Sequence, residues 1–200
     1  MSIEILLLIL AFAKDENIDL TSLSKAIRDG DHNSFSQFYD AHYASLYRFL
    51  ISRGMSHDEA EDLIQKAFIT IWEKRDGIDE TKSLRAYLFQ IAYRQMINHI
   101  EYHSKFRDED LQDLKITAGN PDQDIDYLRL LDIVRKTIAT MPEKRKVVFE
   151  LCFMKQFTYK ETAVALNVSV KTVENHMALA FKDLRKAIIE YYGPKIKKYS

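Results

Sequence analysis

The sequence is poor in glycine, proline and cysteine. Five Gly and three Pro among 200 residues favour long helices joined by few turns. A single cysteine, Cys152, excludes a disulfide within the chain. Its neighbours Phe149, Leu151 and Phe153 predict that Cys152 is a small buried core residue. This use of cysteine fits a reducing cytoplasm.

An apolar run long enough to span a membrane is also missing. Residues 5–13 form an unbroken apolar run of nine, whereas a membrane-spanning helix needs ~20 residues. The run resembles the core of a signal peptide, with Ala11-Phe12-Ala13 as a cleavage site, but the preceding Met-Ser-Ile-Glu carries no positive charge. We therefore interpret residues 1–16 as an apolar extension, which is either a cytoplasmic amphipathic helix or the product of an upstream start codon.

Catalytic signatures are absent as well. The sequence has no Gly-rich phosphate loop and no nucleophile elbow, and Cys152 has no evident activating partner. His99 and His103 are four residues apart, a spacing compatible with zinc, but no third ligand is near them in the sequence. The segment His-Ile-Glu-Tyr-His also lacks the Glu that directly follows the first His of a metalloprotease motif. The sequence thus predicts no enzyme, no metal site and no cofactor.

Charge is distributed unevenly along the chain. Residues 128–200 contain 15 Lys and Arg against 7 Asp and Glu, whereas residues 1–127 contain 14 against 23. A basic second half is what DNA binding by that half requires. Charged residues on solvated helix faces can also differ in number between the two halves without any role in binding, and this would give the same asymmetry.

Apolar residues recur with helical spacing along most of the first half. Asp-Gly-Asp at 29–31 and Arg53-Gly54 interrupt this pattern between residues 17 and 54. Residues 56–74 and 83–103 predict two strong helices, each opened by a serine.

The helical pattern is lost over residues 104–127 and then returns. This segment is rich in acidic residues and contains Gly119-Asn120-Pro121, which is typical of a linker. Helices are predicted at 128–140 and from Met141-Pro142 onward, and Gly193-Pro194 is predicted to end the last one. The fold class predicted is all-α, with two small helical domains joined by a flexible acidic linker.

The helix predicted at 56–74 carries apolar residues on two faces. One apolar stripe is suited to the core. On the opposite face an aliphatic and an aromatic side chain stand among polar ones, which indicates a protein contact surface. Another helix of the same domain could instead cover that face. The residues of this second face are Asp62, Gln65, Ile69 and Trp72.

The helix predicted at 83–103 mixes basic and aromatic side chains outside its buried stripe. Such a mixture can neutralise and stack on single-stranded nucleic acid. A solvated face with tyrosine rings packed beneath it would give the same pattern. The residues are Arg85, Tyr87, Tyr93, Arg94, Asn98, His99 and Tyr102.

Residues 158–181 have the pattern of a helix-turn-helix. Ala163 is small enough for a close helix crossing, and Asn167 stands where a left-handed turn residue is needed. Val173 is the apolar residue that would fix the second helix, and Ser169 can cap it. The second helix of such a motif can enter a DNA major groove.

Several segments together resemble bacterial sigma factors. Residues 62–72, Asp-Leu-Ile-Gln-Lys-Ala-Phe-Ile-Thr-Ile-Trp, and residues 83–94 look like region 2 of that family. Residues 141–149, Met-Pro-Glu-Lys-Arg-Lys-Val-Val-Phe, and the helix-turn-helix look like region 4. Their order, the acidic linker and the absence of a domain between them are similar to the compact extracytoplasmic-function (ECF) group of the sigma-70 family.

The resemblance implies a non-catalytic sigma factor that binds core RNA polymerase and recognises the −10 and −35 promoter elements. Region 2 would occupy 17–103, the linker 104–127, region 4 128–192 and a basic tail 193–200. The partners implied are the β′ clamp helices and β flap of the polymerase, promoter DNA, and an anti-sigma factor that can be membrane-anchored. The free protein would be a cytoplasmic monomer. The alternative is a stand-alone helix-turn-helix transcriptional regulator.

Residue roles follow from the same resemblance. Those implied to bind polymerase are Asp62, Gln65, Phe68, Ile69 and Trp72. Those implied to bind the −10 element, including a base flipped into the loop 77–83, are Asp79, Lys82, Ser83, Arg85, Tyr87, Arg94 and Asn98. Those implied to bind the −35 element are Lys160, Ser169, Lys171, Thr172, Asn175 and His176.

Overall fold

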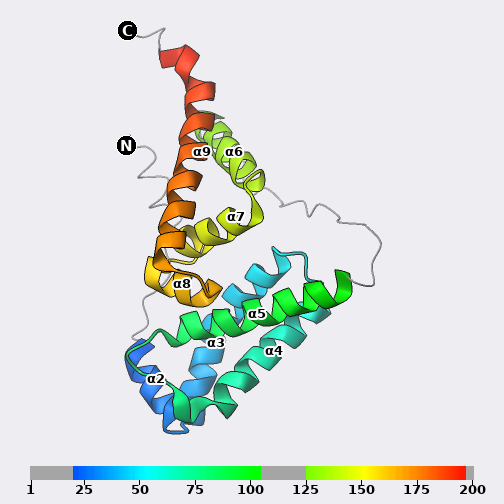
Figure 1. Ribbon diagram of the computed structural model, residues 1–200, viewed down its shortest axis with the longest axis vertical. Helices are drawn as coiled ribbons and strands as arrows, with labels where there is room; N and C mark the ends of the chain where they lie inside the picture. The colour runs from blue at the N-terminus through cyan, green and yellow to red at the C-terminus, as the bar shows by residue number, and fades with distance from the viewer. Residues whose placement is uncertain (1–19, 105–124, 197–200) are drawn as a thin grey trace. The chain divides into compact units, whose positions relative to one another are not determined.

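The computed structural model describes residues 20–104 and 125–196 (Figure 1). The apolar run at 5–13, nearly all of the predicted linker and the last four residues lie outside these ranges. All regular elements within them are helices, which confirms the all-α prediction. Of the helices in these two ranges, none combines the length and apolar character needed to cross a membrane.

The described residues fall into two compact units. One unit contains residues 20–104 together with 160–168. The other contains residues 125–159 and 169–196. The domain boundaries at 17–103 and 128–192 stay predictions.

The first two helices are separated where the sequence predicted a break. Helix α2 (Leu20–Arg28) ends before Gly30, whose φ of +89° is readily adopted only by a residue without a Cβ. Asp31 then caps α3 (His32–Ile51), because its carboxylate accepts a 2.8 Å hydrogen bond from the Ser34 backbone N–H. The aspartates and glycine of this break thus act as stop and start signals.

Helix α4 (His57–Glu73) begins with a capping box. The Glu59 N–H donates to Ser56 Oγ at 3.3 Å, and the Ser56 N–H donates to Glu59 Oε2 at 2.8 Å. The Ser56 backbone bond, together with a hydrogen bond to His99, lowers the pKa of Glu59 to about 2 despite partial burial. The carboxylate is therefore ionised and doubly held at neutral pH.

Helix α5 (Leu84–Ser104) follows a short 3-10 turn, η1 (Arg75–Gly77), and a polar loop. Ser83 caps α5 as predicted, since its Oγ accepts from the Ala86 N–H at 3.2 Å. Helices α3, α4 and α5 contact one another and lie side by side in Figure 1. Their shared interior is aromatic and aliphatic, with these side chains fully or almost fully buried: Phe38, Leu46, Phe49, Leu50, Ile64, Ile71, Leu88, Phe89 and Met96.

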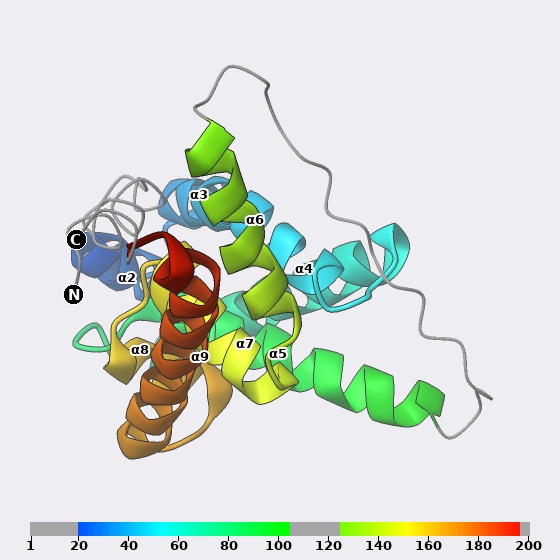
Figure 2. The ribbon, with the colours of Figure 1, turned by 90° about the horizontal axis from the view of Figure 1, so that it is seen from above.

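The second unit is organised around a long last helix. Helix α9 (Val170–Ile196) packs against α6 (Ile125–Ala139) and α7 (Glu143–Phe149), as Figure 2 also shows. Pro142 stands just before α7, where a missing N–H costs no helical hydrogen bond. Helix α8 (Tyr159–Leu166) precedes α9 in the chain.

A π-helical turn, η2 (Glu150–Met154), follows α7 and was not predicted. In it the Lys155 N–H reaches back to the Glu150 carbonyl at 3.1 Å. Phe149 and Phe153 stack at 4.7 Å between ring centroids, and Phe153 also meets Phe181 edge-on. Cys152 is half-buried rather than buried, because Phe149 and Leu151 occupy the interior beside it.

The prediction that Gly193-Pro194 ends the last helix is wrong, since α9 continues to Ile196. A proline removes one backbone hydrogen bond and crowds the carbonyl four residues earlier. Near a helix end this cost is reduced, because the last carbonyls lack helical partners anyway.

The capping box predicts the effect of a single substitution. We expect Ser56→Ala to lower the free energy of unfolding by about 1 kcal/mol, because it removes the acceptor for the Glu59 N–H. Urea denaturation followed by the fluorescence of Trp72, the single tryptophan, reports on the unit that contains α4. Ser36→Ala, at an exposed position inside α3, is the matched control and should change stability by less than about 0.5 kcal/mol. Equal effects of the two substitutions would contradict the assigned role of Ser56.

Candidate nucleic-acid and protein interfaces

One face of α4 carries an exposed surface that we call the α4 surface, made of Asp62, Gln65, Ile69 and Trp72. The side chain of Ile69 is 54% exposed, and Asp62 and Gln65 are also exposed. Trp72 is half-buried. Within the described residues, Ile69 is therefore uncovered, whereas Trp72 on the same face packs partly against α3.

The indole ring of Trp72 is held in place by side chains of its own unit. Its ring lies 4.4 Å from the ring of His32 and 5.0 Å from that of Phe35, measured between centroids. The Arg75 guanidinium lies 4.7 Å from the indole centroid and also donates to the Trp72 carbonyl at 2.9 Å. The α4 surface therefore presents an aromatic group that loses little conformational freedom when a partner binds.

Asp62 already has a partner on the same helix. Lys66 Nζ lies 2.6 Å from Asp62 Oδ2, and both side chains are more than half exposed. Exposed ion pairs of this kind contribute little, roughly 0.2–1 kcal/mol. A stronger basic partner can therefore displace Lys66 at low cost.

Phe68 does not belong to the α4 surface, which corrects the role assigned to it from the sequence. Its side chain is only 3% exposed. Its ring packs against the rings of Tyr39 at 4.6 Å, Phe38 at 5.9 Å and Phe35 at 6.1 Å. Each residue step turns a helix by about 100°, so Phe68 points into the core while Ile69 points outward.

The loop between η1 and α5 is ordered by Asp79. Its carboxylate accepts from the Thr81 hydroxyl at 2.6 Å and the Thr81 N–H at 3.0 Å, and it pairs with Lys82 at 2.9 Å. The Thr81 hydroxyl, the Lys82 ammonium and the Thr81 N–H together lower the pKa of Asp79 to about 2. Asp79 and Lys82 are exposed, so a preformed polar loop faces solvent beside the first turn of α5.

Helix α5 presents three of its four predicted DNA-binding residues on one stripe. Tyr87, Arg94 and Asn98 follow each other at intervals of seven and four residues, and Arg94 and Asn98 are exposed. Arg85 is different, because the same periodicity puts it on the side of the buried Phe89, and its Nε atom is buried. Arg85 therefore does not share the stripe of Tyr87, Arg94 and Asn98.

The turn between α8 and α9 has the geometry predicted for a helix-turn-helix. Asn167 adopts a left-handed conformation with φ of 54°. Ser169 Oγ accepts from the Thr172 N–H at 3.0 Å and so caps α9. Ala163 and Val173 are both buried. The predictions for these turn, cap and core positions are confirmed.

The first turns of α9 expose several polar side chains. Lys171 and Asn175 are exposed, while Thr172 and His176 are half-buried. Lys171 pairs with Glu174 at 3.1 Å, with both side chains substantially exposed. Ser169 and Thr172 share a hydroxyl hydrogen bond of 2.8 Å, and Lys160 is exposed at the second position of α8.

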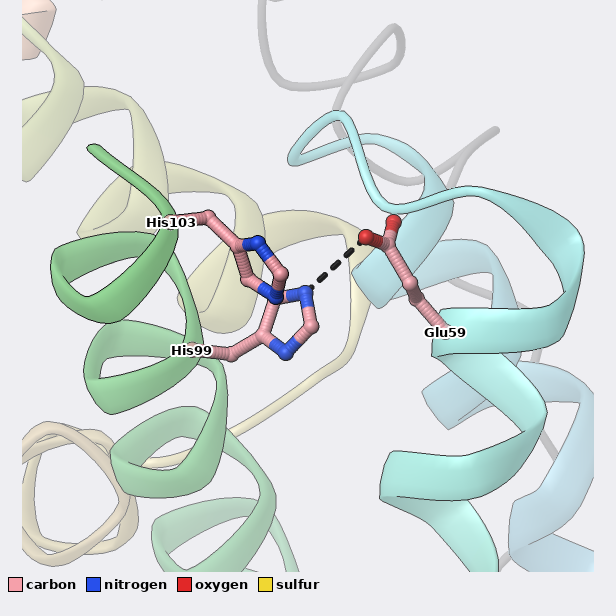
Figure 3. Close-up of side chains that lie close together, drawn as sticks. All are labelled: Glu59, His99 and His103. Carbon is pink, nitrogen blue, oxygen red and sulfur yellow. Dashed lines mark hydrogen bonds and ion pairs between the residues drawn. The ribbon is translucent and has the colours of Figure 1, made fainter. Parts of the chain in front are cut away.

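One cluster was missed by the sequence reasoning. Glu59 at the start of α4 meets His99 and His103 near the end of α5 (Figure 3). His99 Nε2 lies 2.9 Å from Glu59 Oε1. Glu59 is 40 residues away from His99 in the sequence, so no local spacing rule could have found it. The spacing of the two histidines was the only sequence signal.

Two family models match the chain in succession. The model of sigma-70 region 2 matches residues 38–106, and that of sigma-70 region 4 matches residues 131–184. The exposed polar residues of α4, α5 and the first turns of α9 lie within these two matches.

Curated relatives extend over most of the chain. The chain is 24% identical over 172 residues to the RNA polymerase sigma factor NccH of Alcaligenes xylosoxydans xylosoxydans, which covers 83% of this chain and 92% of that protein. It is also 24% identical over 181 residues to the ECF RNA polymerase sigma factor RpoE of Cereibacter sphaeroides. That match covers 86% of this chain and 97% of that protein. A solved structure of CnrH in complex with the cytosolic domain of CnrY has a similar fold, with a TM-score of 0.59 at 21% identity over 84% of this chain and 96% of that chain.

Phe68 and its neighbour provide a matched test of the two sides of α4. We expect Phe68→Ala to lower the free energy of unfolding by about 3–5 kcal/mol, because it leaves a cavity among three aromatic rings. Ile69→Ala should change it by less than about 0.5 kcal/mol, since Ile69 is exposed. Urea unfolding monitored by Trp72 fluorescence measures both. A large loss in Ile69→Ala would mean that α4 is turned differently.

Proposed function

Since this chain belongs to the ECF group of the sigma-70 family, we propose that it is an alternative sigma factor that binds core RNA polymerase and directs it to specific promoters. The observation that carries the proposal is the succession of both sigma-70 regions in one chain. Exposed polar residues lie at positions to which the resemblance assigns contacts in each region, which supports the proposal. This role requires binding and strand separation but no catalytic residue in the protein itself.

The α4 surface is proposed to dock on the clamp helices of the β′ subunit. Ile69 and Trp72 would supply the apolar centre of the contact, and Asp62 and Gln65 its polar rim. Trp72 is braced by His32 and Phe35, which supports its use as a rigid anchor. A basic clamp residue would replace Lys66 as the partner of Asp62.

The −10 element is proposed to meet the Asp79 loop and the α5 stripe. The loop is already shaped by the bonds of Asp79 with Thr81 and Lys82, so capture of a flipped base would need little reordering. Arg94 can neutralise the backbone of a separated strand, and the ring of Tyr87 can stack on a base. Arg85 would act by holding the start of α5, because its side chain is turned toward the core side.

The −35 element is proposed to receive the first turns of α9 in its major groove. Asn175 is exposed and can form a paired hydrogen bond to an adenine edge. Lys160 and Lys171 would contact phosphates, and Lys171 would exchange its exposed pair with Glu174 for that contact. Ser169 and Thr172 keep each other's hydroxyls in place at the entry to the groove.

The regulatory partner is proposed to be an anti-sigma factor, which can be anchored in a membrane, and the sigma factor itself is proposed to work in the cytoplasm. Polymerase and promoter recognition are divided between two tethered modules. Each contact can therefore be weak, because binding of one module raises the effective concentration of the other.

Run-off transcription with purified core polymerase tests the function and the α4 surface together. The wild-type protein should bind core polymerase and initiate from a subset of promoter fragments of its source genome. The double variant Asp62→Ala with Gln65→Ala should lose about tenfold or more in polymerase affinity while keeping its helical circular dichroism signal, because the polar rim of the contact is removed.

The control for that variant has the same residue types and spacing on another helix. Gln37→Ala with Asp40→Ala removes an exposed pair on α3 and should leave polymerase binding unchanged. If the wild-type protein does not bind polymerase and instead binds duplex DNA tightly at a two-fold site, it is a stand-alone regulator. Equal binding by both double variants would refute the assigned docking face alone.

Asn175 and Lys160 separate base reading from phosphate contact. We expect Asn175→Ala to weaken holoenzyme binding by roughly 1–3 kcal/mol on the cognate −35 element and very little on a scrambled one. Lys160→Ala should weaken binding on both sequences. It should also reduce the slope of log K against log salt concentration by about one, the value for one lost phosphate contact. Fluorescence anisotropy with labelled fragments across a salt series measures both. An equal loss on both sequences for Asn175→Ala would assign Asn175 to phosphate instead.

A further inference from the structure

The start of α4 and the end of α5 bring together three side chains of the types that bind transition metals. Glu59 is the third residue of α4, and His99 and His103 are one helical turn apart in the last two turns of α5. In Figure 3 both imidazole rings project from α5 toward the Glu59 carboxylate.

The ligand atoms are already near one another. One atom from each residue lies within 4.8 Å of the other two, and the His99 Nε2 to Glu59 Oε1 distance is 2.9 Å. Bond lengths of about 2.0–2.2 Å to a tetrahedral Zn²⁺ place its ligand atoms about 3.3–3.6 Å apart. The Glu59–His99 pair would need to open by only a few tenths of an ångström, and the exposed His103 side chain would turn toward that pair.

Two local features orient the cluster before any ligand arrives. Glu59 Oε2 accepts from the Ser56 N–H at 2.8 Å, so the capping box aims Oε1 at α5. The two histidines are four residues apart, so they lie on the same side of the helix, and their ring centroids are 4.3 Å apart. Hydrogen-bonded carboxylate ligands of this kind are typical of metal sites, where outer bonds fix the orientation of the inner ligands.

A simple ion pair accounts for only part of this arrangement. The bond between His99 and Glu59 needs no third group, yet His103 places a second imidazole beside the same carboxylate. A divalent cation instead satisfies all three side chains at once, with two neutral nitrogen ligands and one carboxylate.

We propose that Glu59, His99 and His103 form a binding site for one divalent transition-metal cation of the Zn²⁺ class. Imidazole nitrogens select such cations, whereas Mg²⁺ and Ca²⁺ take oxygen ligands almost exclusively. The exposed position of His103 leaves a fourth coordination position for water. The bound ion joins the first turn of α4 to the last turns of α5 and so stabilises the unit that contains both helices. The site does not depend on the proposed promoter function.

The test is Zn²⁺ binding by the full-length protein without a histidine tag. Competition with a chromophoric zinc chelator should give one site per chain with an affinity in the micromolar range or tighter, in the presence of millimolar Mg²⁺. His103→Ala should weaken binding at least tenfold, because it removes a direct ligand while leaving the Glu59–His99 bond in place. His99→Ala should have at least the same effect.

Two control variants test other sources of binding. His57→Ala removes an exposed histidine two residues before Glu59 that lies outside the cluster. Cys152→Ser removes the only thiol. Both should bind one Zn²⁺ as the wild type does. No saturable binding below about 100 μM, or unchanged affinity in His103→Ala, would overturn the proposal.

Thermal unfolding gives a second readout that links the ion to these helices. Zn²⁺ in excess should raise the melting temperature reported by Trp72 fluorescence in the wild type and in His57→Ala. It should have no such effect in His103→Ala, whose circular dichroism without metal should match the wild type because His103 is exposed. A Zn²⁺-induced increase of the same size in His103→Ala would place the ion elsewhere and refute the site.

Discussion

The burial of one side of α4 between α3 and α5 is the constraint on which the functional surfaces of the first unit depend. Ile64, Phe68 and Ile71 are buried on that side. Because a helix turns by about 100° per residue, this burial leaves the α4 surface facing outward. The same packing sets the start of α4 beside the end of α5, where Glu59 and His99 meet.

Caps and braces then give these surfaces their rigidity. Ser56 and Glu59 hold the first turn of α4, and Ser83 holds that of α5. At the opposite end of α4, the ring of Trp72 contacts His32, Phe35 and Arg75. A docking surface and a polar loop that are both ordered before binding lose less entropy when polymerase or DNA arrives. The capping box also aims the carboxylate of the proposed metal site, so one local motif serves both stability and binding.

Local signals predicted the helices and their ends well. Ser56, Ser83 and Ser169 cap the helices that follow them as predicted, and Asn167 forms the predicted left-handed turn. Asp31, within the predicted break, caps α3. These features depend on hydrogen bonds that span at most five residues, so a short segment of sequence contains the information needed. Two residues whose roles came from the family resemblance lie where that resemblance alone did not place them: Phe68 is buried, and Arg85 lies on the other side of α5 from Arg94. Prediction failed at η2 and at Gly193-Pro194, where packing and position near a helix end outweighed the usual preferences.

The sequence by itself determined the family, the all-α class and the capped helices with their inner and outer faces, because each rests on a pattern of neighbouring residues. Only the tertiary structure decided which side chains from distant segments meet. It showed that Ile69 stays uncovered in the described chain, that His32 and Phe35 brace Trp72, and that Glu59 stands beside two histidines some 40 residues later. Contacts of this kind depend on how whole helices pack, and packing is a property of many side chains together rather than of any short segment.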